Sequence, residues 1–511
     1  MSSSKDTRIS SRSAAVTQNE KQRKLDKEQS GKGVVRIVVI CAVVLALLLL
    51  FINTSFFYRN VNTVTITGIN GEEKFSIVDF NFYYTTVAYE TYSEIYDSYG
   101  TMADYVLNPG KPYDEQMYND TATWDDYFTE SAVYTMKNVV LMNDLAEKDP
   151  DFALTEEQQE KLEEHFASAK EFADELKISV SRYFQSTYGK GMNEKIYREN
   201  YTKLFTAQCF SEYMGAKIEG DYTEEQIAAY YEANPNEFNA VSYRVYTVFA
   251  EKGEEVDKEQ ALKDAKETAE KLAAEVKSIE TFEAAVAKYE EENEITSGVG
   301  GGHALLASLE NTGYGEWLFD SERASGDVTV LANSDETGYN IVYFDELDTL
   351  DYNFANVRTT IFYAGQDEET GEITDEAKAE ALKSAEAFFE EWKSGDATED
   401  SFLEVSKKYD EDDEADTVIP GQITELYNGV TGVAAIETWA LDEARQAGDA
   451  ELLELATGYV VVYYVGEGEH ARTAMVRGTM ATEGYNAWVE ESVESYKDEI
   501  HGFGYYFSRD F

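Results

Sequence analysis

The sequence is poor in residues that crosslink, rigidify or transfer protons. Its 511 residues include two Cys, five Pro and four His. Cys41 lies in a long apolar run and Cys209 is the only other cysteine, so the two are not expected to pair and the chain has no disulfide framework. Stability must therefore come from buried side chains, and the 37 Tyr and 26 Phe can supply much of that burial.

Positive charge is also scarce, except at the N-terminus. Lys and Arg number 43 against 100 Asp and Glu, which gives a net charge of −57. Residues 1–36 carry nine basic and four acidic side chains, residues 37–58 carry no charge, and the remainder has a net charge of −62. Such a field repels phosphate backbones, so we expect no nucleic acid partner for the large acidic part.

The longest apolar run lies within residues 34–58, where every side chain from Ile37 to Ile52 is apolar. About 20 helical residues cross the hydrocarbon layer of a bilayer, and basic residues favour the cytoplasmic side. A cleaved signal peptide is the alternative, but the preceding tail is long and no small-x-small cleavage site follows. We predict a disordered basic cytoplasmic tail (1–33), a single transmembrane helix in the lipid bilayer (34–58), and an extracytoplasmic remainder. The lack of disulfides favours a bacterial cell surface.

Residues 60–235 predict a mostly helical domain that begins with a hairpin. Apolar and polar residues alternate over 63–75 around Asn70-Gly71, which is a strong hairpin signal. Ser76, Thr123, Thr155 and Thr223 each precede a helical pattern and are candidate N-caps.

Residues 241–348 and 354–466 repeat each other. Phe282 and Tyr289 match Phe402 and Tyr409, and Gly338-Tyr339 matches Gly458-Tyr459, all at an offset of 120 residues. Between them, Trp317, Asp320, Arg323, Gly326 and Asp327 match Trp439, Asp442, Arg445, Gly448 and Asp449. Each copy reads as strand, two helices, loop and strand, so we predict two tandem α+β domains of one fold.

The last segment, 469–511, has no partner nearby in the sequence. Residues 472–480 are compatible with a strand, and apolar residues from Tyr485 to Ile500 fall at helical spacing. We therefore expect a final amphipathic helix that docks on a domain already folded.

This layout resembles the parvulin-type foldases of bacterial envelopes, the PrsA- and SurA-like proteins. The resemblance is carried by VNTVTITGINGEEKFSIVDFNFYY (61–84), TWDDYFTESAVYTMKNVVLMNDLAEKD (123–149), YTEEQIAAYYEANPNEF (222–238), TFEAAVAKYEEE (281–292), GVGGG (298–302) and SGDVTVLANSDETGYNIVYF (325–344). It implies an α+β fold on a single transmembrane helix. A helical chaperone-like domain (60–235) would precede two tandem parvulin-like domains (241–348 and 354–466), and the C-terminal helical segment (469–511) would dock on the chaperone-like domain.

Parvulins of this family carry two pocket histidines, one on the first strand and one in a Gly-Tyr/Phe-His-Ile pattern on the last. The resemblance places these positions at Val245 and Asn340 in the first repeat, and at Thr359 and Val460 in the second. Because none is histidine, we predict degenerate peptide-binding pockets without catalytic residues, and weak or absent isomerase activity. Prolyl isomerisation needs no nucleophile, so a histidine-free pocket remains compatible with activity.

Other chemistry is not indicated, and we predict no cofactor and no metal site. His303 follows a glycine run but has no second His or Cys nearby, so we interpret it as a loop residue. The acidic run 410–416 lacks the residue order of an EF-hand and reads as a solvated loop. The repeated Trp, Asp, Arg and Gly-Asp positions are interpreted as structural, because such residues pack a core, bridge a helix end and form a turn.

Three hypotheses of function follow. The first is a membrane-tethered chaperone or foldase-like protein that binds unfolded or newly exported polypeptides. The second is an active peptidyl-prolyl cis-trans isomerase with a histidine-free pocket. The third is a structural scaffold for one partner of the envelope.

Overall fold

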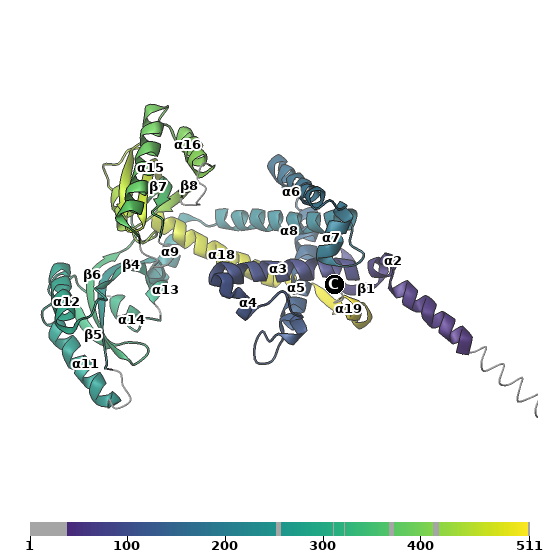
Figure 1. Cartoon of the computed structure of the whole chain (residues 1–511), viewed down its shortest axis with the longest axis horizontal. Helices are drawn as coiled ribbons and strands as arrows, with labels where there is room; N and C mark the ends of the chain where they lie inside the picture. The colour runs from purple at the N-terminus through teal and green to yellow at the C-terminus, as the bar shows by residue number, and fades with distance from the viewer. Residues whose placement is uncertain are drawn as a thin grey trace, which may run out of the picture. The chain divides into compact units, whose positions relative to one another are not determined.

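The computed structural model describes residues 38–251, 257–309, 311–320, 322–366, 373–411 and 418–508. Their contacts divide the chain into two compact units. The helical unit comprises the residues up to Ile218 together with the segment from Gly484 onwards, and the tandem unit is Glu219–Glu483. Each unit is built around its own antiparallel sheet or sheets (Figure 1).

The apolar segment predicted over 34–58 begins outside the described residues and does not form one continuous helix. Residues 38–52 are helical, and Thr54 then caps a separate helix, α2 (Ser55–Asn60), by accepting a hydrogen bond from the Phe57 N–H at 3.2 Å. Phe57 and Tyr58, which the predicted span included, are buried in the core of the helical unit. Among the described residues, no helix has both the length and the apolar composition that a bilayer crossing requires. The predicted tail (1–33) lies outside the described residues.

The helical unit starts with the hairpin indicated by Asn70-Gly71. Strands β1 (Asn62–Gly68) and β2 (Gly71–Ser76) pair antiparallel, and Gly71 has the positive φ of +113° that this turn requires. The helices that follow are α3 (Ile77–Tyr99), η1 (Gly100–Met102), α4 (Ala103–Val106), η2 (Tyr113–Glu115), α5 (Trp124–Lys148), α6 (Glu156–Glu175), α7 (Val180–Tyr188) and α8 (Glu194–Gly220). Ser76, Thr123 and Thr155 form capping boxes, as their positions in the sequence indicated.

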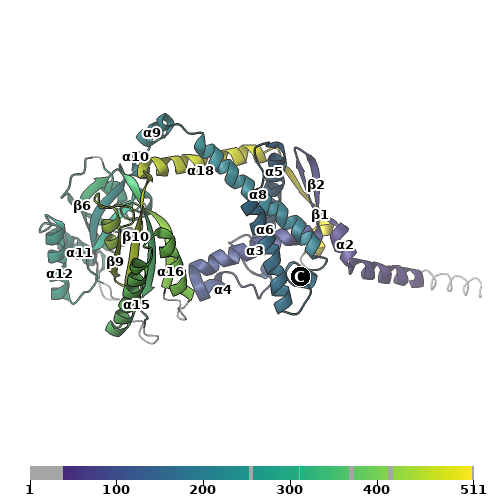
Figure 2. The same cartoon turned by 90° about the horizontal axis from the view of Figure 1, so that it is seen from above.

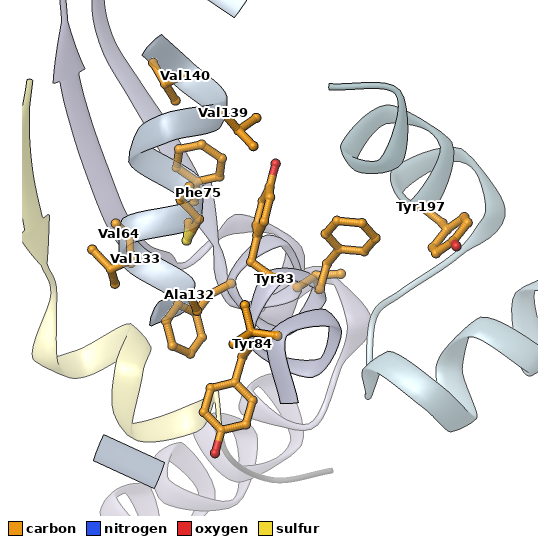
Figure 3. Close-up of a cluster of buried hydrophobic side chains, with 14 of the residues drawn as sticks. Val64, Phe75, Tyr83, Tyr84, Ala132, Val133, Val139, Val140 and Tyr197 are labelled. Atoms are coloured by element: carbon orange, nitrogen blue, oxygen red, sulfur yellow. The ribbon is translucent and has the colours of Figure 1, made fainter. Parts of the chain in front are cut away.

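The core of the helical unit is aromatic. Phe80, Phe82, Tyr83 and Phe128 are almost fully buried, and the Tyr83 and Phe82 rings meet edge-on at 5.1 Å. Figure 3 shows Tyr83 and Tyr84 pointing in different directions from α3, with the Tyr83 hydroxyl on the side of Val139 and Val140 and the Tyr84 hydroxyl directed away from them. Consecutive tyrosines thus supply a buried ring and a ring at the edge of the core.

The C-terminal segment differs from its prediction in two places. Helix α18 (Ala471–Val493) includes residues 472–480, which were predicted as a strand, because Val476 and Met480 lie one turn apart and pack on Ile227 and Phe238. The helix ends at Val493 instead of continuing to Ile500.

The end of the chain instead adds a third strand to the hairpin. Strand β11 (Lys497–Ile500) pairs antiparallel with β1, with Val64 opposite Ile500, and α19 (Gly502–Phe507) follows. Tyr496 is buried beside the strand and donates a hydrogen bond to Asp144 at 2.9 Å. The docking of this segment on the helical unit therefore uses backbone pairing as well as side chains.

The tandem unit begins earlier than the predicted boundary at residue 235. Helices α9 (Glu224–Ala233) and α10 (Pro235–Phe238) belong to it, because Ile227 and Phe238 form a small core with the first part of α18. The helical domain therefore ends near Ile218.

Two four-stranded sheets with the same strand order make up the rest of the tandem unit. The first contains β3 (Ala240–Phe249), β4 (Gly300–Leu305), β5 (Val328–Ala332) and β6 (Gly338–Asp348) in the order β4-β3-β6-β5. The second contains β7 (Asn353–Tyr363), β8 (Val418–Leu426), β9 (Ala450–Leu455) and β10 (Gly458–His470) in the order β8-β7-β10-β9. The two sheets thus have one topology.

Helices cover both faces of each sheet. In the first, α11 (Lys258–Ala273) and α12 (Ile279–Asn293) lie on one face, and α13 (Leu306–Leu309) and α14 (Gly315–Leu318) lie on the other (Figure 1). In the second, α15 (Asp375–Ser394) and α16 (Glu399–Glu411) cover one face and α17 (Ala434–Ala440) covers the other. Each sheet is therefore the middle layer of a small three-layer domain.

The repeated Trp, Asp, Arg and Gly-Asp residues form the same structure in both copies. The Arg323 guanidinium lies over the Trp317 ring at 4.8 Å, and 3.1 and 3.5 Å from the carboxylates of Asp320 and Asp327. Gly326 has a φ of +94°, which a residue with a side chain adopts only with strain.

In the second copy, Arg445 lies over Trp439 at 4.1 Å, between Asp442 and Asp449, and Gly448 has a φ of +96°. These residues hold the turn that leads into β5 and β9, and no reacting group is involved.

Candidate functional site

The first repeat brings the two predicted pocket positions to one face of its sheet. Val245 on β3 and Asn340 on β6 both lie on the face covered by α13 and α14. Every second residue of a strand points to the same face, and Tyr243 and Val342, two residues from these positions, pack in the core on that face. In the strand register Asn340 is opposite Thr247, two residues beyond Val245.

Asn340 is buried and is paired across the strands. Its Oδ1 accepts a hydrogen bond from the Thr247 hydroxyl at 2.8 Å. The Asn340 side-chain amide thus occupies a position where the resemblance implies a histidine, and the Thr247 hydroxyl lies beside it. They can position a carbonyl group but cannot exchange a proton at neutral pH.

The second repeat places Thr359 and Val460 in the same relation. Both lie on the face covered by α17, with Val357 and Val462 as neighbours on that face. Val460 is opposite Ile361 and Thr359 is opposite Val462, so the offset between the two positions is the same as in the first repeat. No titratable side chain stands at any of the four positions.

All four histidines lie in the described residues, and none reaches these two faces. His165 on α6 stacks on Tyr201 with ring centroids 3.8 Å apart, and burial lowers its pKa. His470 lies 3.0 Å from Asp351, and His501 contacts the Thr65 hydroxyl at 2.7 Å. These contacts are structural.

His303 was predicted to lie in a loop, but it lies on β4 and is largely buried. Its Nδ1 is 2.9 Å from the Ser242 hydroxyl and 3.1 Å from the Asn428 side-chain amide, and its Nε2 is 3.3 Å from Asp348. Because an amide N–H and a hydroxyl can both donate to Nδ1, the ring proton belongs on Nε2, facing the carboxylate. His303 therefore connects the two repeats, which no local pattern in the sequence indicated.

Asp348 is the charged member of this cluster. Burial acts to raise its pKa, but hydrogen bonds from His303, the Leu350 N–H and Tyr352 outweigh it and hold the pKa below its usual value. The Tyr352 hydroxyl also accepts from the Asn428 N–H at 3.1 Å. Polar contacts of His303, Asp348, Tyr352 and Asn428 thus link the two repeats.

A cavity of about 700 Å³ lies beside this network in the tandem unit. Its lining includes Asp348, Tyr352, Asn428, Glu437 and Tyr464, and none of the four predicted pocket positions. Most of the buried polar groups in its lining already form hydrogen bonds within the protein. The Glu437 carboxylate accepts hydrogen bonds from the N–H groups of Gly429 and Thr431 and from the Thr431 hydroxyl, at 2.6 to 2.9 Å.

The helical unit contains two further cavities, each lined in part by residues of α3. One of about 820 Å³ is lined by Tyr84, Thr85, Ala88, Tyr89, Tyr92, Pro109, Lys111, Pro112, Tyr113, Asp114, Asp125 and Thr187. The other, of about 540 Å³, is lined by Val87, Glu90, Thr91, Glu94, Tyr127, Glu130, Ser131, Tyr134 and Thr135. Tyrosines and carboxylates dominate both. We call these residues together the tyrosine–carboxylate surface. The sequence indicates many aromatic residues but not their arrangement around cavities.

Within the described residues, no group of three or more His, Cys, Asp or Glu side chains is arranged to hold a metal ion.

One comparison with known families identifies part of the tandem unit. Residues 222–347 match the family model described as the PPIC-type PPIASE domain. The chain contains a parvulin-type domain. The match runs from just before α9 to the end of β6, so it takes in the whole first sheet, including Val245 and Asn340. A search of curated proteins found no match to the chain.

The match identifies the parvulin-type domain but does not test the predicted pocket positions. The resemblance implies histidines at Val245 and Asn340, and both positions instead carry groups that do not titrate. The second sheet repeats the strand order but lies outside the matched residues. The predicted α+β fold and the parvulin-type domain are therefore confirmed, and the site residues stay a prediction.

Proposed function

We propose that this protein is a membrane-tethered, extracytoplasmic chaperone of foldase type, which binds unfolded or newly exported polypeptides. The parvulin-type domain supports the foldase assignment, since that family acts on polypeptide chains. The apolar run Ile37–Ile52 behind a basic tail supports a single-pass anchor with the bulk of the protein outside a bacterial cell. The second sheet acts as a further, degenerate parvulin-like module.

The observation that carries this proposal is the tyrosine–carboxylate surface of the helical unit. Tyr89 on α3 is 74% exposed and Tyr134 on α5 is 54% exposed. Large apolar groups exposed around cavities are typical of surfaces that bind other chains. The abundant negative charge keeps such a surface from self-association.

Aggregation suppression tests the proposal. Full-length protein in neutral detergent is mixed with a chemically unfolded client at equimolar ratio, and light scattering is followed. We expect a clear delay of aggregation. The double variant Tyr89→Ser/Tyr134→Ser should weaken client binding about tenfold, since truncation of an interface aromatic typically costs about 1 kcal/mol or more.

Tyr506→Ser provides the control, because Tyr506 is 77% exposed but lies on α19, outside this surface. It should leave the delay unchanged. Unmodified protein that fails to delay aggregation would show that the chaperone proposal is wrong.

Isomerase activity is the second candidate, favoured by the match of residues 222–347 to the PPIC-type domain. With Val245 and Asn340 in the pocket, we expect a rate on a proline tetrapeptide close to the uncatalysed one. Turnover typical of the family, measured by NMR exchange on the full chain, would instead establish a histidine-free isomerase.

A further inference from the structure

We propose that the tyrosine–carboxylate surface selects basic polypeptide segments, extended stretches rich in Lys and Arg. This proposal rests on the proposed function and names the class of client. It depends on three observations: the distribution of charge along the helical unit, the lining of the two cavities, and the length of the exposed surface along α3.

Charge is distributed very unevenly within the helical unit. Residues 77–135, which contain α3, α4 and the first half of α5, include eleven acidic residues, eleven tyrosines and a single basic residue, Lys111. Residues 136–218 include fifteen acidic residues but also eleven basic ones, and only five tyrosines. Most of the negative charge is therefore offset in the second stretch, which has a net charge of −4, and little is offset in the first, which has a net charge of −10 and contains most of the cavity lining.

The cavity between α3 and α5 has no basic residue in its lining. Glu90 and Glu94 reach it from α3 and Glu130 from α5, with the rings of Tyr127 and Tyr134 beside them. Partial burial and the neighbouring Glu94 charge raise the pKa of Glu90. Like charges thus crowd at a place where a bound ammonium or guanidinium group would relieve them.

The larger cavity combines four tyrosine rings with two carboxylates. Tyr84, Tyr89, Tyr92 and Tyr113 line it, and the buried Asp125 accepts a hydrogen bond from the Tyr84 hydroxyl at 2.9 Å. A cation over an aromatic face is stabilised by the ring quadrupole, more so next to a carboxylate.

The chain uses this combination elsewhere for its own arginines. Arg445 lies on the Trp439 ring between two aspartates, and Arg323 lies on Trp317 in the same way. Around α3 the rings and carboxylates are present, and Lys111 is the one basic residue in the lining of either cavity.

The dimensions favour an extended segment over a single small cation. The cavity residues on α3 run from Tyr84 to Glu94, and the exposed Tyr96 and Tyr99 follow on the same helix. Helix α4 lies at the end of α3 (Figure 2). Sixteen helical residues span about 24 Å, which matches about seven residues of extended chain. Such a segment is long enough to run along α3 past the residues of both cavities.

Peptide binding to the full-length protein in neutral detergent tests the inference. Three fluorescein-labelled 12-residue peptides share two Phe and differ only in carrying Lys, Gln or Glu at four positions. We expect the Lys peptide to bind about tenfold more tightly than the Gln peptide, because several partly screened charge pairs each contribute modestly. The Glu peptide should bind most weakly, and raising the salt concentration should reduce the difference between the Lys and Gln peptides.

Two triple variants locate the effect. Glu90→Gln/Glu94→Gln/Glu130→Gln should weaken binding of the Lys peptide about tenfold and leave the Gln peptide within twofold. Glu164→Gln/Glu171→Gln/Glu175→Gln removes the same charge from exposed positions on α6 and should change neither by more than twofold.

Equal affinity for the three peptides, no binding of any, or equal effects of the two triple variants would each overturn the inference. The aggregation assay with an uncharged client separates this failure from failure of the proposed function. Suppression without charge preference would leave the chaperone assignment standing.

Discussion

The two sheets of the tandem unit share a frame but differ in where they bury polar side chains. Both begin their last strand with Gly-Tyr, and both hold an arginine on a tryptophan between two aspartates. In the first sheet the buried polar pair is Thr247 and Asn340, on the face covered by α13 and α14. In the second, the equivalent residues are Ile361 and Val460, both apolar.

The second sheet has its polar pair on the opposite face instead. The hydroxyls of Thr360 on β7 and Ser406 on α16 lie 3.0 Å apart, and Ser406 also accepts a hydrogen bond from the Gly421 N–H at 2.7 Å. Either face therefore tolerates polar groups as long as they are paired. The comparison shows that the two sheets keep one strand order although their polar pairs lie on different faces.

The largest effect should come from the matched core phenylalanines. Phe282 and Phe402 occupy equivalent positions and are both fully buried, so Phe282→Ala and Phe402→Ala should each cost about 3–5 kcal/mol. Hydrogen exchange followed peptide by peptide can resolve the two sheets. We expect each variant to lose protection in its own sheet only. Loss in both sheets from either variant would show that the repeats unfold as one unit.

The next largest effect concerns the glycines that begin the last strands. A Cβ at Gly338 would lie 2.5 Å from the Val248 carbonyl oxygen, and one at Gly458 would lie 2.1 Å from that of Phe362. We expect Gly338→Ala and Gly458→Ala each to destabilise their sheet by about 2–3 kcal/mol. Gly458→Ala should be the worse of the two, since Gly458 also has a φ of +151°. Gly478→Ala, at an open position on α18, is the control and should be tolerated.

Replacing the polar pair of the first sheet by the apolar pair of the second should have a smaller effect. It tests directly whether polar groups inside a sheet are tolerated only when they are hydrogen-bonded to each other. Asn340→Val leaves the Thr247 hydroxyl without its partner and should cost about 1–3 kcal/mol. The double variant Thr247→Ile/Asn340→Val copies the second sheet and should recover most of that loss. Denaturant unfolding measures both. A double variant as unstable as the single one would contradict the idea that pairing, and not polarity, is what matters.

The smallest expected effect is the pH dependence from Asp348 at the junction of the repeats. Its pKa is lower in the folded state than in the unfolded chain, so its contribution is fully present above the ordinary value of about 4 and is lost as pH falls through the lower folded pKa. Asp348→Asn should therefore cost about 1 kcal/mol at pH 7 and progressively less below about pH 4. A cost independent of pH would show that the carboxylate charge is not involved.

Local patterns predicted much of the fold. The Asn70-Gly71 turn, the capping residues Ser76 and Thr123, and the mixed α+β character all appear in the structure as expected. The parvulin-type domain was also predicted, from motif positions spread over residues 222–344. The positions Val245 and Asn340 came from the resemblance, and the structure places both on one sheet face; their role stays a prediction.

The wrong predictions for residues 472–480 and His303 share a physical cause: contacts with distant residues, which local sequence does not show, decided both structures. Residues 472–480 contain β-branched and small residues and Gly478, which weaken a helical pattern, yet packing of Val476 and Met480 on α9 and α10 makes them helical. His303 follows three glycines, which suggested a loop, yet those glycines let β4 lie close against β3; a Cβ at Gly301 would be 2.5 Å from the Tyr243 carbonyl oxygen.

The sequence by itself determined the order of elements, the repeat and the excess of negative charge, because turns, caps and periodicity act over a few residues. Only the tertiary structure decided which distant groups meet. Strand β11 is four exposed residues that become a strand by pairing with β1, more than 400 positions earlier in the chain. The cavities flanking α3 likewise arise where separate segments converge, since a helix alone forms no cavity.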